Sequence, residues 1–205
     1  ALRVLVLGDG PGNDSLVLAH AGFVLDYFDV PGSRTSAFAR RRFEASGLLG
    51  RAIRPVADYG GLLDGRYDAV VTFELLEHLP DPVAAIRDIA AMLRPGGIAL
   101  VTEGFGAVAD PWPTHLLANR RFEGRTPFLF LAHGLRLAWY GRRPTFRPFE
   151  FEKVGRPTAR DRLRLLLDGH VLGRWLSGRL HALRPAPYGR TGPTESAASV
   201  PAADA

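Results

Sequence analysis

Three glycines lie close together near the start of the chain, in the run Gly8-Asp-Gly10-Pro-Gly12. They follow a continuous apolar stretch and precede a segment with helical character, which predicts a tight turn between a strand and a helix. Glycine leaves the backbone N–H groups of such a turn open to a ligand, because no Cβ stands in the way. Asp29 ends the next apolar stretch, 21 residues after Gly8. An acid at that spacing can accept hydrogen bonds from both hydroxyls of a ribose.

A third predicted strand ends at Asp58. Its carboxylate and the N–H of Tyr59 could hold the edge of an adenine. The same acid also suits a loop carboxylate that precedes Tyr-Gly-Gly, and the residues alone leave both interpretations open. Three successive strand ends therefore carry groups suited to an adenosine.

A second group of chemical residues follows the fourth predicted strand, in the run Glu74-Leu-Leu-Glu77-His78, and His115 lies in a later loop. Two carboxylates and two imidazoles could bind one divalent cation such as Mg²⁺, which would lower the pKa of an acceptor hydroxyl. Alternatively, His78 or Glu77 packs a helix or acts as a base without a metal. Histidine suits proton transfer near neutrality. His115 could also be a loop histidine bonded to a backbone carbonyl.

Strand-like and helix-like segments alternate along the first half of the chain, which predicts an α/β fold with a mostly parallel sheet and helices on both faces. The predicted strands are residues 2–7, 23–28, 54–57, 67–73, 98–102, 135–140 and 146–154. The predicted helices are residues 15–20, 36–46, 82–93 and 127–133, and Arg94-Pro-Gly-Gly is expected to end the third of them. The last two strands are expected to form an antiparallel hairpin that closes one edge of the sheet.

This order of motifs resembles the class I S-adenosylmethionine-dependent methyltransferases over about residues 2–154. The resemblance rests on the glycine turn, the acids after the second and third strands, Leu76-Glu77-His78-Leu79 and Leu93-Arg-Pro-Gly-Gly97. It implies a Rossmann-like seven-stranded, mostly parallel sheet with a terminal antiparallel hairpin, and S-adenosylmethionine as the cofactor. The cofactor contacts that it implies are Gly8, Asp9, Gly10, Gly12, Asp29, Val30, Asp58, Tyr59 and Phe73.

One position departs from the family pattern, because Val6 stands where the family usually has an acid. Asp9, inside the turn, is the candidate to take over part of that role. The run Glu-x-x-Glu-His also looks like the metal-binding motif of ubiquinone-synthesis O-methyltransferases and of small-RNA 3′-end methyltransferases. That likeness implies a metal site of Glu74, Glu77, His78 and His115. We take His78, His115 and Glu77 as the catalytic candidates.

The charge is unevenly distributed, which suggests three parts. Residues 1–155, the expected methyltransferase domain, carry 18 Lys+Arg and 17 Asp+Glu, whereas residues 156–190 carry eight Arg and two Asp. We expect the second part to be a basic amphipathic helical extension with its helix at 160–183, and residues 191–205 to be a disordered tail. The extension could pack on this domain, on a neighbouring domain before residue 1, or on a membrane surface as a peripheral contact. Nucleic acid is not an expected partner, because the body lacks a basic excess.

The absence of cysteine excludes a disulfide framework, a thiolate zinc site and a cysteine nucleophile. No signal peptide or long apolar span is apparent, so we expect a cytoplasmic domain of a longer chain. The function that fits these observations is O-methylation of a small molecule or sugar. The alternatives are metal-assisted 2′-O-methylation of an RNA 3′ end and a degenerate binding domain without catalysis. A nicotinamide-dependent dehydrogenase shares the first turn and acid, but it fits the Leu-Glu-His run and the terminal hairpin poorly.

Overall fold

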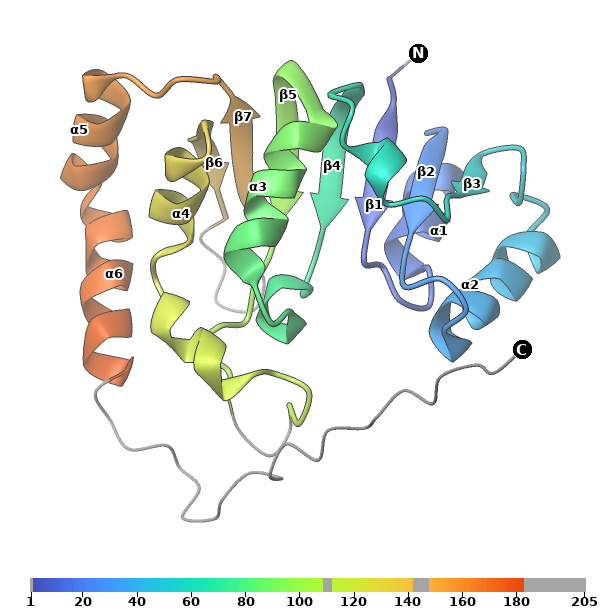
Figure 1. The fold of residues 1–205 in the computed structure, drawn as a ribbon, viewed down its shortest axis with the longest axis horizontal. Helices are drawn as coiled ribbons and strands as arrows, with labels where there is room; N and C mark the ends of the chain where they lie inside the picture. Colours follow the sequence, from blue (N-terminus) through green and yellow to red (C-terminus); the bar gives the residue numbers. More distant parts are fainter. Residues whose placement is uncertain (1, 109–111, 142–147, 183–205) are drawn as a thin grey trace, which may run out of the picture.

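A computed structural model describes residues 2–108, 112–141 and 148–182. They form a seven-stranded sheet in the order β3-β2-β1-β4-β5-β7-β6 (Figure 1). The strands are β1 (Val4–Leu7), β2 (Leu25–Phe28), β3 (Ile53–Pro55), β4 (Tyr67–Thr72), β5 (Leu93–Val101), β6 (Leu135–Tyr140) and β7 (Phe149–Lys153). β1 to β5 pair in parallel, and β7 runs antiparallel to both β5 and β6. The predicted Rossmann-like sheet with its terminal antiparallel hairpin is confirmed.

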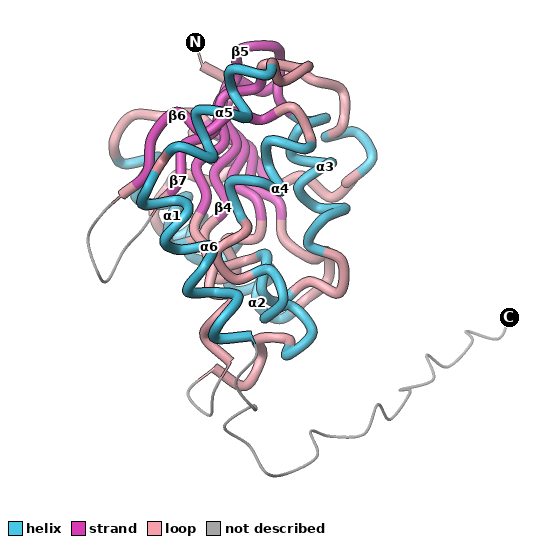
Figure 2. The backbone as a smooth tube through the Cα atoms, turned by 90° about the vertical axis from the view of Figure 1, so that its left-hand side faces the viewer, coloured by secondary structure: helices cyan, strands magenta, loops and turns pink. Residues whose placement is uncertain are grey.

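The α-helices are α1 (Asn13–His20), α2 (Arg34–Ala45), α3 (Pro82–Met92), α4 (Thr126–Ala132), α5 (Ala159–Leu167) and α6 (Gly169–Ala182). Three short 3₁₀ helices are η1 (Gly60–Leu62), η2 (Leu76–His78) and η3 (Leu117–Phe122). Figure 2, turned by 90°, shows the helices on both sides of the twisted sheet.

Alternate residues of the strands fill two cores, because successive side chains of a strand point to opposite faces. Leu5 and Leu7 of β1 pack in the core that includes residues of α3 and α4. Val4 and Val6 pack in the core that includes Ala39 and Phe43 of α2 and residues of α1. The continuous apolar run at the start of the chain is therefore a strand buried on both faces.

The Arg-Pro-Gly-Gly segment does not end the third helix as expected, because β5 already begins at Leu93. Leu93 pairs with Tyr67, and the register shifts before Ile98 pairs with Ala69. Within this irregular stretch, Arg94 Nε donates to Asp68 at 2.6 Å. A Cβ on Gly97 would lie 3.0 Å from the carbonyl oxygens of Arg94 and Tyr67. The segment is a bulged start of the strand, and glycine is needed because the backbones approach closely.

The expected single helix at 160–183 is two helices, α5 and α6, with a break at Asp168. The carboxylate of Asp168 accepts the N–H groups of His170 and Val171, so it caps the start of α6. A capping box formed by Thr158 and Asp161 begins α5.

The extension packs on the body of the domain. Leu165 of α5 and Val171 of α6 are buried together with Leu131 of α4. Arg136 of β6 bonds Asp161, and the hydroxyl of Tyr140 bonds Asp168. Of the alternatives considered for the extension, packing on this domain holds for one side of these helices.

Some sequence predictions fall on residues that the structure does not describe. The expected disordered tail 191–205, most of the hairpin turn at 141–144 and the first residues of the strand 146–154 belong to this group. Across the described residues, every helix is too short or too polar to cross a membrane.

Candidate functional site

The glycine turn connects the carboxyl end of β1 to α1, and its backbone conformation and close contacts disfavour any residue other than glycine. Gly8, Gly10 and Gly12 all have positive φ angles, of 72°, 53° and 81°. A Cβ on Gly12 would lie 2.4 Å from the ring of Phe43, and a Cβ on Gly8 would lie 2.7 Å from the side chain of Leu75. The turn is therefore held against α2 on one side and against the segment after β4 on the other.

Asp29, at the end of β2, is tied directly to this turn. Its Oδ2 accepts the N–H of Gly10 at 2.7 Å, and its Oδ1 accepts the N–H of Val30 at 2.7 Å. The hydroxyl of the buried Tyr27 donates to the carbonyl of Gly10 at 2.6 Å. A carboxylate oxygen has more than one lone pair, so Asp29 retains acceptor capacity for ribose hydroxyls. The structure thus brings together the two residues that the sequence proposed for one ligand.

Asp9 lies in the turn, but its carboxylate faces α1. Oδ1 accepts the N–H of Asp14 at 3.0 Å, and Oδ2 accepts the N–H of Ser15 at 2.8 Å. It therefore satisfies donors at the start of α1. Burial, and then the charge of Asp9, raise the pKa of Asp14. Val6 is buried in the core, so position 6 offers no polar group.

Asp58 and Tyr59 follow β3 after a short connection. Asp58 is exposed, and a Cβ on Gly61 would lie 2.7 Å from its Oδ2, so this carboxylate lies over the start of η1. This placement favours the loop-carboxylate interpretation at least as much as an adenine contact. The ring of Tyr59 packs on Phe28 with centroids 5.2 Å apart, and its hydroxyl donates to Asp88. Burial and Asp88 raise the pKa of Tyr59 to about 12.

The second cluster forms where η2 meets the loop after β5. Glu77 is fully buried, and Nε2 of His115 lies 3.8 Å from its Oε1. His78 lies beside His115, with ring centroids 4.8 Å apart. One ligand atom from each of Glu77, His78 and His115 lies within 4.8 Å of the others. Among the described residues, neither carboxyl oxygen of Glu77 has a hydrogen-bond partner, and Nδ1 of His115 has none. Buried polar atoms without partners are unusual, so the cluster suits a ligand.

The tautomer of His78 follows from its hydrogen bond to the backbone. Its Nδ1 lies 3.1 Å from the carbonyl oxygen of Thr114. A carbonyl only accepts, so Nδ1 carries the proton and Nε2 presents a lone pair. His78 is thereby set up to accept a proton or to ligate a cation.

Glu74 lies beside this cluster and has a strained backbone conformation. Its φ is +50°, the one positive value outside glycine in the described residues, and its N–H donates to Oγ1 of Thr102 at 3.1 Å. Strained non-glycine residues concentrate at functional sites. A Cβ on Gly104 would lie 2.9 Å from Cε1 of His115, 3.2 Å from Oε1 of Glu77 and 3.4 Å from Oε2 of Glu74. Glu74 thus borders the cluster, although it is outside the three-residue set.

Burial raises the pKa of Glu77 to about 8, and the nearby charges of Glu74 and Glu103 add to the increase. Without a cation, Glu77 is therefore largely protonated at neutral pH. A bound cation would reverse this balance, because an opposite charge favours the ionised carboxylate.

Two residues that contribute to this region, Asn119 and Glu103, were not predicted from the sequence. Asn119 of η3 is buried, and its Nδ2 donates to the carbonyls of Leu79 at 2.8 Å and Glu77 at 3.1 Å. It therefore fixes the backbone that carries Glu77 and His78. Glu103, two residues after the end of β5, accepts the Thr126 hydroxyl at 2.8 Å and the Phe105 N–H at 3.0 Å. An acid directly after the predicted strand 98–102 was the available signal for Glu103, whereas nothing in the sequence marks Asn119.

The two clusters are neighbours because they follow adjacent parallel strands. β1 pairs with β4, and Leu75, next to Glu74, contacts Gly8 closely enough to exclude a Cβ there. Phe73 directly follows β4 and packs against the core of β1 and α2. Parallel α/β sheets bind ligands at the carboxyl ends of their strands, which is where these residues lie.

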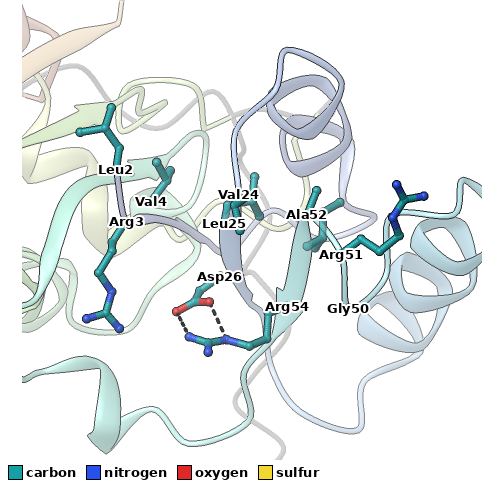
Figure 3. A pocket seen from close by; sticks show the side chains of 11 residues that line it. Leu2, Arg3, Val4, Val24, Leu25, Asp26, Gly50, Arg51, Ala52 and Arg54 are labelled. Atoms are coloured by element: carbon teal, nitrogen blue, oxygen red, sulfur yellow. Dashed lines mark hydrogen bonds and ion pairs between the residues drawn. The ribbon is translucent and has the colours of Figure 1, made fainter.

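A separate hollow of about 430 Å³ lies at the opposite, amino-terminal ends of β1, β2 and β3. Figure 3 shows Asp26 and Arg54 joined there by two hydrogen bonds, each 2.8 Å long. The hydroxyl of Tyr67 also donates to Asp26. Asp26, the acid of this hollow, is thus bonded by its neighbours, and the hollow lies away from both clusters.

The sheet order, the glycine turn with Asp29 and the group beside β4 define a class I S-adenosylmethionine-dependent methyltransferase. The chain belongs to the family described as "Methyltransferase domain", which matches residues 2–147. S-adenosylmethionine is the cofactor of this class.

Relatives and solved structures agree with this assignment. A ubiquinone biosynthesis O-methyltransferase from Xanthomonas campestris pv. campestris (strain B100) is 35% identical over 95 residues, which cover 46% of this chain and only 40% of the relative. A methyltransferase structure from Aquifex aeolicus has a TM-score of 0.60 at 14% identity, covering 75% of this chain and 82% of that chain. Phosphoethanolamine N-methyltransferase 2 from Haemonchus contortus, solved with S-adenosylhomocysteine, has a TM-score of 0.52 at 19% identity, covering 66% of this chain and 33% of that chain.

Proposed function

We propose that this protein transfers the methyl group of S-adenosylmethionine to an oxygen atom of a small-molecule or sugar acceptor. The observation that carries the proposal is the convergence of Glu77, His78 and His115 beside the glycine turn. The relative named for ubiquinone biosynthesis is an O-methyltransferase, and its similarity supports an oxygen acceptor. Residues 1–155 are nearly neutral, which favours such an acceptor over RNA.

The turn and the strand ends would hold the cofactor. The N–H groups of the glycine turn and the carboxylate of Asp29 suit the cofactor's polar atoms, with Asp29 on the ribose. Val30, Asp58, Tyr59 and Phe73 lie at neighbouring strand ends and would surround the adenine. S-adenosylmethionine, when bound, supplies a methyl group on a positively charged sulfur that is open to in-line displacement.

His78 is the proposed general base. Its Nδ1 is held by the Thr114 carbonyl, so Nε2 can take the acceptor hydroxyl proton as the new C–O bond forms and the C–S bond breaks. His115, whose ring packs edge-on against His78 and whose Nε2 lies near Glu77, would orient the acceptor hydroxyl toward His78. Alignment of acceptor and methyl group supplies much of the rate in such a displacement.

We further propose that Glu77, His78 and His115 can instead bind a divalent cation, with Glu74 beside them. Nε2 of His78 would then be a ligand, so the cation, and not His78, would promote loss of the acceptor hydroxyl proton to water. The unpartnered carboxyl oxygens of the buried Glu77 fit such an ion. A cation, when bound, would lower the pKa of the acceptor hydroxyl. Two imidazoles and one carboxylate favour Mn²⁺ or Co²⁺ over Mg²⁺, because Mg²⁺ prefers oxygen ligands.

The test is a transfer assay with methyl-labelled S-adenosylmethionine and a panel of phenols, catechols and sugars. We expect transfer to at least one hydroxylated acceptor, an increase with Mn²⁺, and a loss of roughly 100-fold or more in His78→Gln. Asp64→Asn, an exposed acid far from the site, is the control. Transfer to amines only would contradict the oxygen acceptor, and full activity with a strong chelator would contradict the cation.

A further inference from the structure

The outward side of the extension exposes a row of leucines. On α5, Leu163, Leu166 and Leu167 are 55%, 53% and 73% exposed. On α6, Leu176 and Leu180 are 49% and 65% exposed. Their spacing of three and four residues places them on the sides of the helices that face away from the buried Leu165 and Val171. Figure 1 places α5 and α6 at the outer edge of the molecule, beside α4, and in Figure 2, which faces that edge, they lie in front of the sheet.

Exposed arginines accompany these leucines along residues 156–182. They are Arg156, Arg160, Arg162, Arg164 and Arg179. Arg160 and Arg164 flank Leu163 and Leu167 at helical spacing, so they share one side of α5. We call the five leucines and five arginines together the α5–α6 face.

The two acids of residues 156–182 are turned inward. Asp161 closes the capping box with Thr158 and bonds Arg136, and its side chain is 11% exposed. Asp168 bonds the hydroxyl of Tyr140 and the start of α6. On the outward side of residues 156–182, all formally charged side chains are therefore positively charged. The outward side therefore combines exposed leucine side chains with arginine charges that no nearby acid of this range neutralises.

We propose that the α5–α6 face binds the surface of a membrane that contains anionic phospholipids. Helices with leucines and arginines on one exposed surface lie in the interface of such membranes, where the leucines reach the acyl chains. The guanidinium groups would bind lipid phosphates, and their long stems let the charge stay at headgroup level. A second copy of the chain is a poorer occupant, because a symmetric contact would set arginines against arginines.

The test is flotation of the full chain with vesicles of phosphatidylcholine and phosphatidylglycerol. We expect the protein to float with these vesicles at low salt, to be released by high salt, and to stay unbound with phosphatidylcholine alone. Leu163→Gln with Leu167→Gln should abolish flotation. Arg160→Gln with Arg164→Gln should weaken partitioning roughly thirtyfold.

The matched control is Arg40→Gln with Arg41→Gln, which removes the same charge from exposed positions of α2. This pair should keep flotation near the wild-type level. Circular dichroism melting checks that every variant is folded. Three results would overturn the proposal: no flotation with the anionic vesicles, equal losses in the α2 and α5 pairs, or leucine variants that still float. A dimer in sedimentation that the leucine variants break, without flotation of the wild type, would assign the face to a second copy instead.

Discussion

Nη2 of Arg174, on α6, lies 3.5 Å from Oε1 of Glu103, two residues after the end of β5. The carboxylate is nearly buried, and its neighbour Gly104 contacts the cluster of Glu77 and His115. The guanidinium of Arg174 also lies over the ring of Phe149, 4.9 Å from its centroid. The extension is therefore joined to the candidate catalytic region by a charged contact as well as by apolar packing.

Arg174→Gln should destabilise the protein by about 2 kcal/mol, because it leaves a nearly buried carboxylate without its cation. Burial raises the pKa of Glu103, while Phe105, Thr126 and Arg174 lower it. Removing Arg174 raises this pKa further, so the loss of stability should grow as pH rises and Glu103 ionises. Urea unfolding at acid and neutral pH measures this. Arg162→Gln, at an exposed position of α5, is the control, and an equal effect in both variants would contradict the account.

Glu77→Gln should stabilise the cation-free protein, with a gain that grows from about pH 4.5 to pH 8. The pKa of Glu77 is raised from 4.5 to about 8 in the folded state, chiefly by burial. Over this window the folded state binds more protons than the unfolded state, so the wild type loses stability as pH rises. The loss is on the order of a few kcal/mol, and it is absent in the glutamine variant.

Thermal unfolding at pH 5 and pH 8 tests this sign. Added Mn²⁺ should raise the melting temperature of the wild type and leave Glu77→Gln nearly unchanged, since binding to the folded state stabilises it. A variant that is less stable than the wild type at pH 8 would show that the carboxyl group makes a net favourable interaction.

Gly12→Ala should cost about 3 kcal/mol or prevent folding of the turn. The new Cβ would lie 2.4 Å from Phe43, and φ is +81°. Gly32→Ala is the matched control, because its φ of +76° is similar but no atom lies within 4 Å of the new Cβ. The control should cost only about 1 kcal/mol of backbone strain. Similar losses of unfolding free energy in both variants would show that the contact with Phe43 is unimportant.

Much of the fold followed from local sequence patterns. The apolar runs of β1, β2 and β4 and the glycine turn could be predicted because burial and turn chemistry are local properties. The start of β5 could not, because Pro95 and Gly96 suggest a helix end and only the pairing of Leu93 with Tyr67 makes that stretch part of a strand. The break between α5 and α6 was missed although Asp168-Gly169 is a cap signal, since the leucine spacing continues across it.

The sequence predicted the main residues of the site but not the residues that hold them in position. Gly10 and Asp29 do meet, and so do Glu77, His78 and His115. The side chain of Asp9 could not be assigned from its position in the turn, because its bonds to α1 depend on how the turn folds back. Asn119 acts across 42 residues of sequence on the Glu77 carbonyl, and no local pattern reveals such a contact.

The measurement that tests the central claim most directly is calorimetric titration of the protein with S-adenosylhomocysteine, for the wild type, Asp29→Ala and Asp64→Ala. The account predicts binding at one site by the wild type and by Asp64→Ala, at an exposed acid. It predicts a loss of roughly 100-fold in Asp29→Ala, because a charge-assisted hydrogen bond to the ribose is removed. Folded wild-type protein that binds no S-adenosylhomocysteine, or equal affinity in Asp29→Ala, would contradict the assignment of the turn and Asp29 as the cofactor site.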